Sequence, residues 1–120
     1  AEQKAANRLT EAERKAAVKR AAQMLAEKTA HFAKEMGVTY GRITIREQKT
    51  RWGSCSSAGN LNYNWKLVLM PERVMDYVVI HELAHRKEMN HSARFYAVVA
   101  QQMPDYKVWQ SWMKEHGREY

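Results

Sequence analysis

The sequence has only one cysteine, Cys55, and no long apolar run. A single cysteine excludes an internal disulfide framework and a zinc finger built from several cysteines, and it favours a reducing, cytoplasmic setting. No apolar run approaches the roughly 18 residues of a membrane-spanning helix, and the first residues, Ala1–Lys4, form no apolar signal-peptide core. We therefore expect a cytoplasmic protein without a membrane partner.

Size and charge favour one globular domain. The 120 residues can build one modest core but not two, so we expect a single domain over residues 1–120. Hydrophobic residues make up 45% and charged residues 28%, a balance typical of globular proteins. The formal net charge is +7. Most of the excess lies in the first half, which could attract nucleic acid, but no aromatic residues interleave with the Lys and Arg of segment 8–20. A solubilising helix face is therefore favoured.

The first half predicts a long helix after a disordered lead-in over residues 1–9. Thr10 and Glu13 have the spacing of a capping box, and the chain from there to Met36 is rich in Ala, Lys, Glu and Arg, which favour helices. Gly37 stands where a helix ends in a left-handed residue. Apolar residues at helical spacing predict this buried stripe: Val18, Ala22, Leu25, Phe32 and Met36.

Three short segments predict a small, mostly antiparallel sheet of about three strands. They are residues 42–46, 52–55 and 61–65, with turn-forming residues at 56–60. The third segment alternates cleanly, which places Leu61, Tyr63 and Trp65 on one face and Asn60, Asn62 and Asn64 on the other.

The second half predicts three further helices. Pro71 is suited to open a helix over residues 72–89, and its apolar residues lie nearly all round, so it should run through the middle of the domain. Residues 93–103 and 105–117 predict two amphipathic helices, separated by Pro104. Together these elements predict an α+β domain with its helices on one side of the sheet.

The central predicted helix contains His81-Glu82-Leu83-Ala84-His85. Two histidines four residues apart lie on the same face of a helix, so both imidazoles can bind one ion, at about 2.0–2.1 Å for zinc. Zinc lowers the pKa of its bound water to near 7. Glu82 can act as the general base that activates this water to attack a peptide carbonyl, and then carry the proton to the leaving group.

A third protein ligand would leave one position of the metal open, and His91 is the candidate. A straight helix would rotate position 91 away from His81 and His85, so the helix must end or turn before it. Asn90 tolerates a left-handed backbone and could supply the turn, and Ser92 could cap the next helix.

The sequence resembles the YgjP-like zinc metallopeptidases, closely over roughly its second half and loosely over the preceding helix and strand. The matching residues are Thr50-Arg51-Trp52-Gly53-Ser54-Cys55, Gly59, Leu61, Asn64-Trp65, Leu67, Pro71, the segment 77–85, Asn90-His91-Ser92 and Phe95. The combination is specific, although no single piece is. The resemblance implies one zinc ion at the three histidines, a catalytic Glu82, and a compact zincin-like fold with the metal in a cleft. Tyr96 stands where the family usually has Trp.

Several other residues are candidates for binding substrate or stabilising a transition state. Asn64 could orient substrate or the metal site. The phenol groups of Tyr77 and Tyr96 could stabilise a tetrahedral intermediate, although packing is the commoner role for tyrosine.

The segment 51–55 should lie near the cleft if the resemblance holds. There a sheet edge could bind the substrate backbone, and Gly53 would permit close approach. Trp52 is a substrate-site candidate, with ordinary core packing as the favoured alternative. Cys55 could be a fourth metal ligand or a thiol switch, but a small buried strand residue is favoured.

Three functions fit these observations. The favoured one is a zinc-dependent peptidase acting on a peptide or protein. The second is a metal-dependent hydrolase of nucleotide phosphoanhydrides, which the lack of a glycine-rich phosphate loop weakens. The third is a non-catalytic, metal-stabilised module that binds DNA or a protein through the basic first helix.

Overall fold

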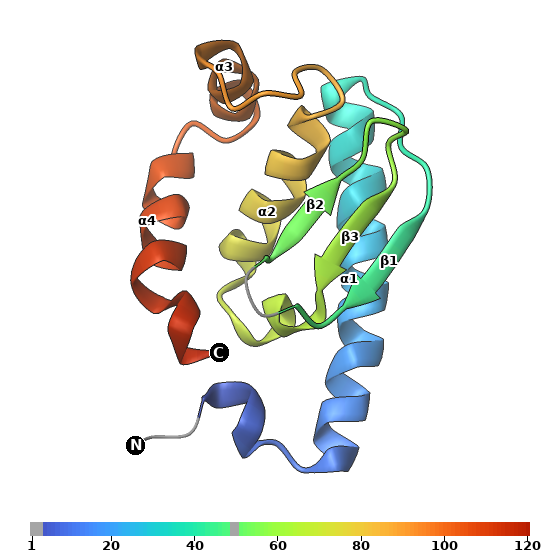
Figure 1. Ribbon diagram of the computed structural model, residues 1–120, viewed down its shortest axis with the longest axis vertical. Helices are drawn as coiled ribbons and strands as arrows, with labels where there is room; N and C mark the ends of the chain where they lie inside the picture. Colours follow the sequence, from blue (N-terminus) through green and yellow to red (C-terminus); the bar gives the residue numbers. More distant parts are fainter. Residues whose placement is uncertain (1–3, 49–50) are drawn as a thin grey trace.

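Four α-helices and three β-strands form most of residues 4–48 and 51–120, which the computed structural model describes. In chain order the elements are the 3₁₀ helix η1 (Ala5–Arg8), α1 (Glu11–Met36), β1 (Ile43–Arg46), β2 (Gly53–Cys55), β3 (Leu61–Asn64), the 3₁₀ helix η2 (Trp65–Leu69), α2 (Glu72–Ala84), α3 (Ala93–Gln102), α4 (Tyr106–His116) and the 3₁₀ helix η3 (Gly117–Glu119) (Figure 1). The α+β class predicted from the sequence is confirmed. None of the described helices is both long and apolar enough to cross a membrane.

Local signals set both ends of α1. The hydroxyl of Thr10 accepts a hydrogen bond from the amide of Glu13 at 3.1 Å, and the Glu13 carboxylate accepts one from the amide of Thr10 at 2.8 Å. The predicted capping box is therefore confirmed. At the other end Gly37 has a φ of 68°, and its amide bonds to the carbonyl of Lys34. This is the left-handed helix end that the glycine predicted.

The chain before α1 needs one correction. The disordered lead-in predicted for residues 1–9 is not what residues 5–8 form, because they make η1 and bury Ala6 at 2% exposure. Residues 1–3 lie outside the described residues. A buried alanine gives this short segment a hydrophobic contact that its sequence alone did not indicate.

The face of α1 that packs on the core is turned by about one residue from the predicted one. Leu25 and Met36 are buried as expected, but Ala22 is exposed and Val18 and Phe32 are only partly buried. The residues that are buried are Ala17, Ala21, Leu25, Thr29, Ala33 and Met36. The alanines let the backbone of α1 approach its neighbours closely, and the larger side chains flank the contact.

The sheet is mixed, with strand order β1-β3-β2. β3 pairs antiparallel with β2 and parallel with β1, so the mostly antiparallel arrangement predicted from the sequence is corrected. The chain reverses direction between β1 and β2 and again between β2 and β3. β1 and β3 therefore run the same way, and β3 enters between the other two. This order leaves β2 as an edge strand.

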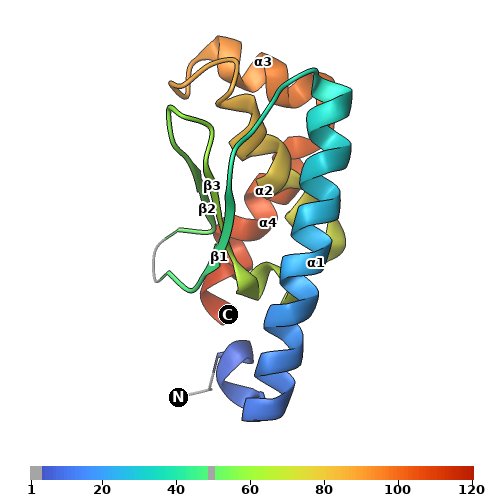
Figure 2. The ribbon, with the colours of Figure 1, turned by 90° about the vertical axis from the view of Figure 1, so that its right-hand side faces the viewer.

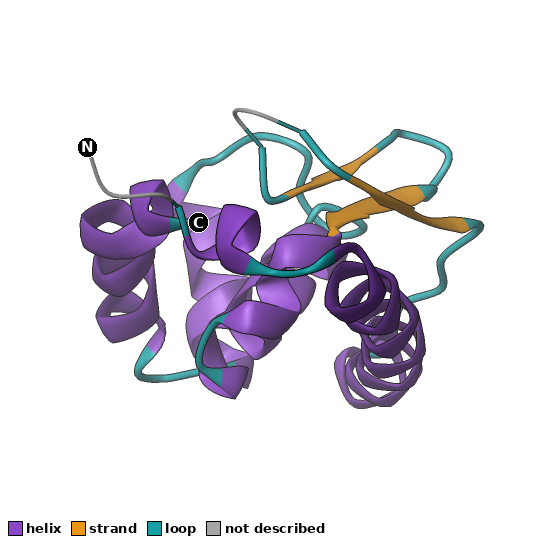
Figure 3. Cartoon of the chain, turned by 90° about the horizontal axis from the view of Figure 1, so that it is seen from below, coloured by secondary structure: helices purple, strands orange, loops and turns teal. Residues whose placement is uncertain are grey.

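Helices α1 and α2 cover one face of the sheet, and no described helix covers the other (Figures 2 and 3). Leu61, Tyr63 and Trp65 point to the covered face, as predicted, and each is at most 2% exposed. The hydroxyl of Tyr63 lies 3.0 Å from that of Thr29 on α1, which satisfies both groups in the core.

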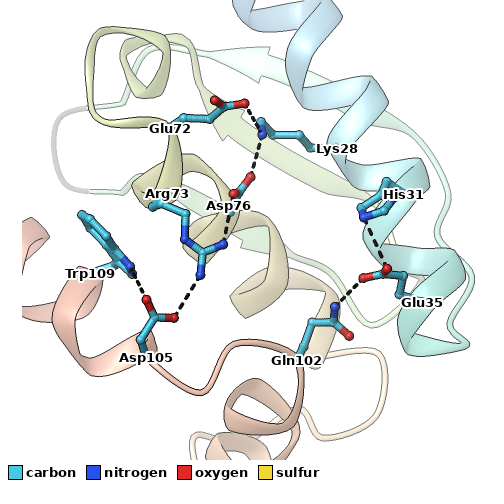
Figure 4. A network of polar contacts seen from close by, with 9 residues as sticks. All are labelled: Lys28, His31, Glu35, Glu72, Arg73, Asp76, Gln102, Asp105 and Trp109. Atoms are coloured by element: carbon cyan, nitrogen blue, oxygen red, sulfur yellow. Dashed lines mark hydrogen bonds and ion pairs between the residues drawn. The ribbon is translucent and has the colours of Figure 1, made fainter.

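The core helix of the domain is α2. It begins after Pro71, as predicted, and ten of its thirteen residues are buried, so almost its whole circumference is packed. A chain of ion pairs ties it to its neighbours (Figure 4). Lys28 of α1 lies 2.7 Å from the carboxylate of Asp76. Arg73 bridges Asp76 at 3.5 Å and Asp105, which directly precedes α4, at 3.0 Å.

Candidate metal centre

The C-terminal end of α2 carries the first two histidines of the predicted site. The helix ends at Ala84, five residues before the predicted boundary at 89. Its last turn tightens, because the amide of Arg86 bonds to the carbonyl of Leu83 at 2.9 Å and that of Lys87 to the carbonyl of Ala84 at 3.0 Å. The early end frees the following residues to fold back over the helix.

The turn to His91 does not use the predicted left-handed asparagine. Among the described residues no side-chain-bearing residue has a positive φ, so Asn90 is not left-handed. Its carbonyl instead accepts a hydrogen bond from the amide of Ser92 at 2.8 Å. The hydroxyl of Ser92 then caps α3 by accepting from the amide of Phe95, as predicted. Several tight turns after Ala84, rather than one left-handed residue, therefore bring the chain round to His91.

The three histidines converge on one point. Each of His81, His85 and His91 offers a ring nitrogen, and these nitrogens all lie within 4.8 Å of one another. Zinc binds imidazole nitrogen at about 2.0–2.1 Å, and a cluster of three nitrogens this close together is compatible with a single metal ion. They form the one group of at least three potential metal-ligating residues found within residues 4–48 and 51–120. Three imidazoles and no thiolate are a donor set that suits zinc.

Phe95 of α3 supports all three imidazoles. Its ring centroid lies 4.9 Å from that of His81, 4.5 Å from that of His85 and 5.0 Å from that of His91. The side chain is fully buried. Sequence reasoning gave Phe95 no role in the site, although its position four residues after His91, on the helix that His91 leads into, was the available signal.

A backbone carbonyl orients the most buried histidine. The Nδ1 of His85 lies 3.2 Å from the carbonyl oxygen of Glu88. Because a carbonyl only accepts, Nδ1 must carry the proton, which leaves Nε2 free as a metal ligand. Desolvation, and then the charges that His81 and His85 can carry, lower the pKa of His91. A neutral imidazole is the form that binds a metal.

Glu82 lies beside the histidines in a buried position. Its side chain is 7% exposed. One carboxylate oxygen, Oε2, lies 3.2 Å from Nδ1 of His81, and the other, Oε1, lies 4.0 Å from Nε2 of His85. Each carboxylate oxygen thus lies near a ring nitrogen of one of the two histidines.

The histidines and Glu82 open into a cleft of about 550 Å³ between α2, β2 and α4. Its lining consists of Arg51, Trp52, Gly53, Ser54, Cys55, Tyr77, Val78, His81, Glu82, His85, Met89, His91 and Met113. The cleft therefore includes two of the predicted substrate-site candidates, Trp52 and Tyr77. Burial raises the pKa of Tyr77 to about 12, so its phenol stays protonated at neutral pH.

Gly53 brings β2 directly against the buried carboxylate. A Cβ atom added at this glycine would lie 3.1 Å from Cγ and from Oε2 of Glu82, and 3.1 Å from Cγ1 of Val78. These separations are shorter than ordinary van der Waals contact. The close backbone approach predicted for Gly53 therefore takes place, and its partner is the catalytic candidate itself.

Two other candidates do not line the cleft. The side-chain amide of Asn64 donates to the carbonyls of Gln48 and Arg51, at 3.0 and 3.4 Å, and its oxygen accepts from the amide of Lys66. Asn64 is buried at 2% exposure rather than facing solvent, because it holds the connection between β1 and β2. The ring of Tyr96 stacks on Tyr106.

Cys55 lies at the cleft wall but apart from the histidines. Its side chain is only partly buried, which corrects the favoured prediction of a buried strand residue. It is not part of the three-residue metal-ligating group. Burial, and then the carboxylate of Glu82, raise the pKa of its thiol, so it stays protonated and is a poor metal ligand.

Comparison with known protein families agrees with this geometry. The model of the family described as YgjP-like, metallopeptidase domain, matches residues 1–116. The chain belongs to the YgjP-like metallopeptidases. The family predicted from the sequence motifs is thus confirmed.

Solved structures show the same fold. The YgjP-like chain is similar to the crystal structure of the metallopeptidase zymogen abylysin of Pyrococcus abyssi, with 24% identity and a TM-score of 0.67 over 76% of this chain and 93% of that one. It is also similar to the crystal structure of the metallopeptidase zymogen jannalysin of Methanocaldococcus jannaschii. The identity there is 19% and the TM-score is 0.58, over 70% of this chain and 90% of that one. No curated protein sequence matches the chain. The predicted α+β fold is thus shared with these metallopeptidases, and the family supports a metal-dependent peptidase.

Proposed function

We propose that the protein is a zinc-dependent peptidase in which His81, His85 and His91 hold one zinc ion. The observation that carries the proposal is the convergence of three imidazoles, within 4.8 Å of one another, beside a buried carboxylate in an open cleft. Two of these ligands come from one turn of α2, and the third comes from a loop that folds back over its end. Such an arrangement leaves the cleft side of the ion accessible to substrate.

In this proposal Glu82 is the general base of peptide hydrolysis. When bound, zinc supplies a Lewis acid that polarises a peptide carbonyl and acidifies water. Glu82 takes a proton from the attacking water at its carboxylate and later delivers it to the leaving amine. Its oxygen Oε2 is held near His81 and under Gly53, so the carboxylate has little freedom to turn away. Burial keeps it from being solvated by bulk water.

The edge of β2 is the proposed binding site for the substrate backbone. β2 pairs with β3 on one side, and within the described residues its other edge has no strand partner. The same residues, Gly53–Cys55, line the cleft beside Glu82. An extended peptide can add to such an edge through main-chain hydrogen bonds. Tyr77, which also lines the cleft, is the proposed donor of a hydrogen bond to a developing oxyanion.

Glu82→Gln tests the mechanism. This variant should retain one zinc per chain by elemental analysis, because the histidines are unchanged, while kcat for peptide hydrolysis falls by about 10² to 10⁴-fold. Glu27→Gln, at an exposed position of α1, is the matched control and should keep full activity. His91→Ala should lose the zinc itself.

Two results would overturn the proposal. One is a Glu82→Gln variant that hydrolyses peptides as fast as the unchanged protein. The other is turnover of nucleoside triphosphates with none of peptides, which would favour the phosphoanhydride alternative.

A further inference from the structure

Arg51 is an arginine at the cleft. Among the described residues, Arg51 is the one lysine or arginine that lines the cleft, and Glu82 is the one carboxylate that does so. Arg51 is exposed, and its guanidinium has no hydrogen-bond or ion-pair partner within residues 4–48 and 51–120. Arg86, next to His85, is different, because it donates to the carbonyls of Thr39 and Ser57 at 2.8 and 3.1 Å. Arg86 holds loops together, whereas Arg51 is free to meet a ligand.

The backbone of Arg51 is fixed although its side chain is free. Its carbonyl accepts a hydrogen bond from the side chain of Asn64, and the next carbonyl, of Trp52, accepts one from the amide of Asn64 at 2.9 Å. These bonds hold the two residues before β2, where the chain bends at Trp52, against Asn64. Arg51 precedes Gly53, which touches Glu82, by two positions. Arg51 therefore lies beyond the Gly53 end of β2, and it lines the same cleft as Glu82.

We propose that Arg51 binds a carboxylate of the substrate on the C-terminal side of the bond to be cleaved. This inference rests on the peptidase function proposed above. A peptide that pairs antiparallel with β2, the more stable pairing, runs from the Cys55 end towards Arg51. Its residues after the cleaved bond therefore approach the guanidinium. Arginine binds carboxylates through two parallel charge-assisted hydrogen bonds.

The carboxylate can come from two sources with the same chemistry. One is the side chain of an aspartate or glutamate within three residues after the cleaved bond. The other is the C-terminal carboxylate of a short peptide, which would make the enzyme release small C-terminal fragments. Both sources give the same prediction for Arg51. They differ in the change to the peptide that abolishes recognition, which is glutamate to glutamine for a side chain and amidation for the C-terminus.

A peptide scan tests this specificity. One glutamate is moved through each position on both sides of the cleaved bond in a glutamine background, and each peptide is made with a free and an amidated C-terminus. For the unchanged protein, kcat/KM should rise about tenfold to hundredfold for a carboxylate after the cleaved bond, as a charge-assisted hydrogen bond supplies. Arg51→Glu should abolish this preference and favour a lysine at the same position. Arg94→Glu, an exposed arginine on α3, changes the net charge equally and should keep it.

A binding measurement separates this inference from the function on which it rests. The affinity of the same peptides for the zinc-loaded Glu82→Gln protein, with and without Arg51→Glu, should show the same preference without turnover. Three results would overturn the inference. They are equal affinity for glutamate and glutamine at every position together with equal affinity for free and amidated C-termini, equal losses with Arg51→Glu and Arg94→Glu, and a preference for glutamate before the cleaved bond. A protein that binds these peptides selectively but hydrolyses none would instead contradict the proposed peptidase function.

Discussion

The two long walls of the cleft are held in very different ways. On one side, ten of the thirteen residues of α2 are buried, and β2 is pressed against Glu82 through Gly53. On the other side, none of the eleven residues of α4 is buried. α4 is joined to α2 partly through the ion pair between Asp105 and Arg73, two side chains that are about half exposed.

This difference matches the demands that hydrolysis makes on each wall. Ligands and a general base must keep their geometry closely, since small misplacements cost large factors in rate. A wall that contributes mainly Met113 to the cleft has no such requirement and can adapt to different substrate side chains. We therefore expect substitutions in the α2–β2 wall to change kcat, and substitutions that loosen α4 to leave kcat nearly unchanged.

Gly53→Ala should have the largest effect among the substitutions that leave every metal ligand and Glu82 in place. The added Cβ would lie 3.1 Å from Glu82 and Val78, so β2 or the carboxylate must shift by a few tenths of an ångström. We expect kcat to fall by about a hundredfold, as displacement of a catalytic group does. Zinc content should stay at one per chain, because the three potential metal-ligating residues, His81, His85 and His91, are unchanged. Steady-state kinetics and elemental analysis measure both.

The matched control is Gly117→Ala. A Cβ there would meet Met113 and Trp52 at 3.5 Å, an ordinary contact on the α4 side of the cleft, and kcat should stay within about twofold because such contacts need no rearrangement. If both alanine variants lost activity equally, the two walls would be equally constrained and the comparison would fail.

Features that depend on neighbours close in sequence were those that the sequence could predict. The spacing of His81 and His85, the Pro71 start of α2 and the Thr10 capping box depend on neighbours within one or two helical turns, and these predictions are confirmed for the helix starts. The spacing of the three histidines also predicted their convergence, and their side chains do come together. Local chemistry suffices for such features because the interacting groups are close in sequence.

Features set by distant partners were not predictable in the same way. The buried line of α1 runs through Ala21 and Ala33 rather than Phe32, because the helix opposite requires small side chains. The burial of Asn64 depends on the carbonyls of Gln48 and Arg51, which only the folded connection brings close. The hydrophobic periodicity of a sequence indicates which face of a helix is apolar, but it does not indicate which element packs against that face.

Tyr77→Phe probes the place where the two walls meet and should have an intermediate effect. The phenol lies on α2, lines the cleft and receives a side-chain hydrogen bond from Gln110 of α4. Removing one neutral hydrogen-bond donor to the transition state should lower kcat by about tenfold while KM changes little. Steady-state kinetics on a single peptide substrate separates the two parameters.

Tyr96→Phe removes the same hydroxyl from a tyrosine that does not line the cleft. Its ring stacks on Tyr106 at 5.8 Å between centroids, and the phenylalanine keeps that packing, so kcat should not change. Equal losses of kcat in the two variants would show that the hydroxyls act through the packing of α2 and α3 against α4. The role of Tyr77 as a donor to the reacting group would then be wrong.

Asp105→Ala should have the smallest effect, and it should be confined to α4. The carboxylate accepts hydrogen bonds from the indole of Trp109 at 3.1 Å and from Arg73 at 3.0 Å (Figure 4). Without it, the amides of α4 should exchange hydrogen several times faster at neutral pH, because local opening needs fewer contacts to break. The amides of α2 and the value of kcat should not change. Hydrogen exchange followed by mass spectrometry resolves the two helices.

Low pH should weaken the same contacts of Asp105 in the unchanged protein, because it protonates the carboxylate. The hydrogen bond from Trp109, followed by the charge of Arg73, lowers the pKa of Asp105. Because the folded-state pKa is below that of the unfolded chain, the carboxylate contributes fully above about pH 4, the ordinary range of an aspartate. This contribution is lost as the pH falls through the lowered pKa. The difference in α4 protection between the unchanged protein and Asp105→Ala should therefore be constant near neutral pH and vanish in acid. A difference that persisted below that pKa would mean that the Asp105 side chain holds α4 through contacts that do not need its charge.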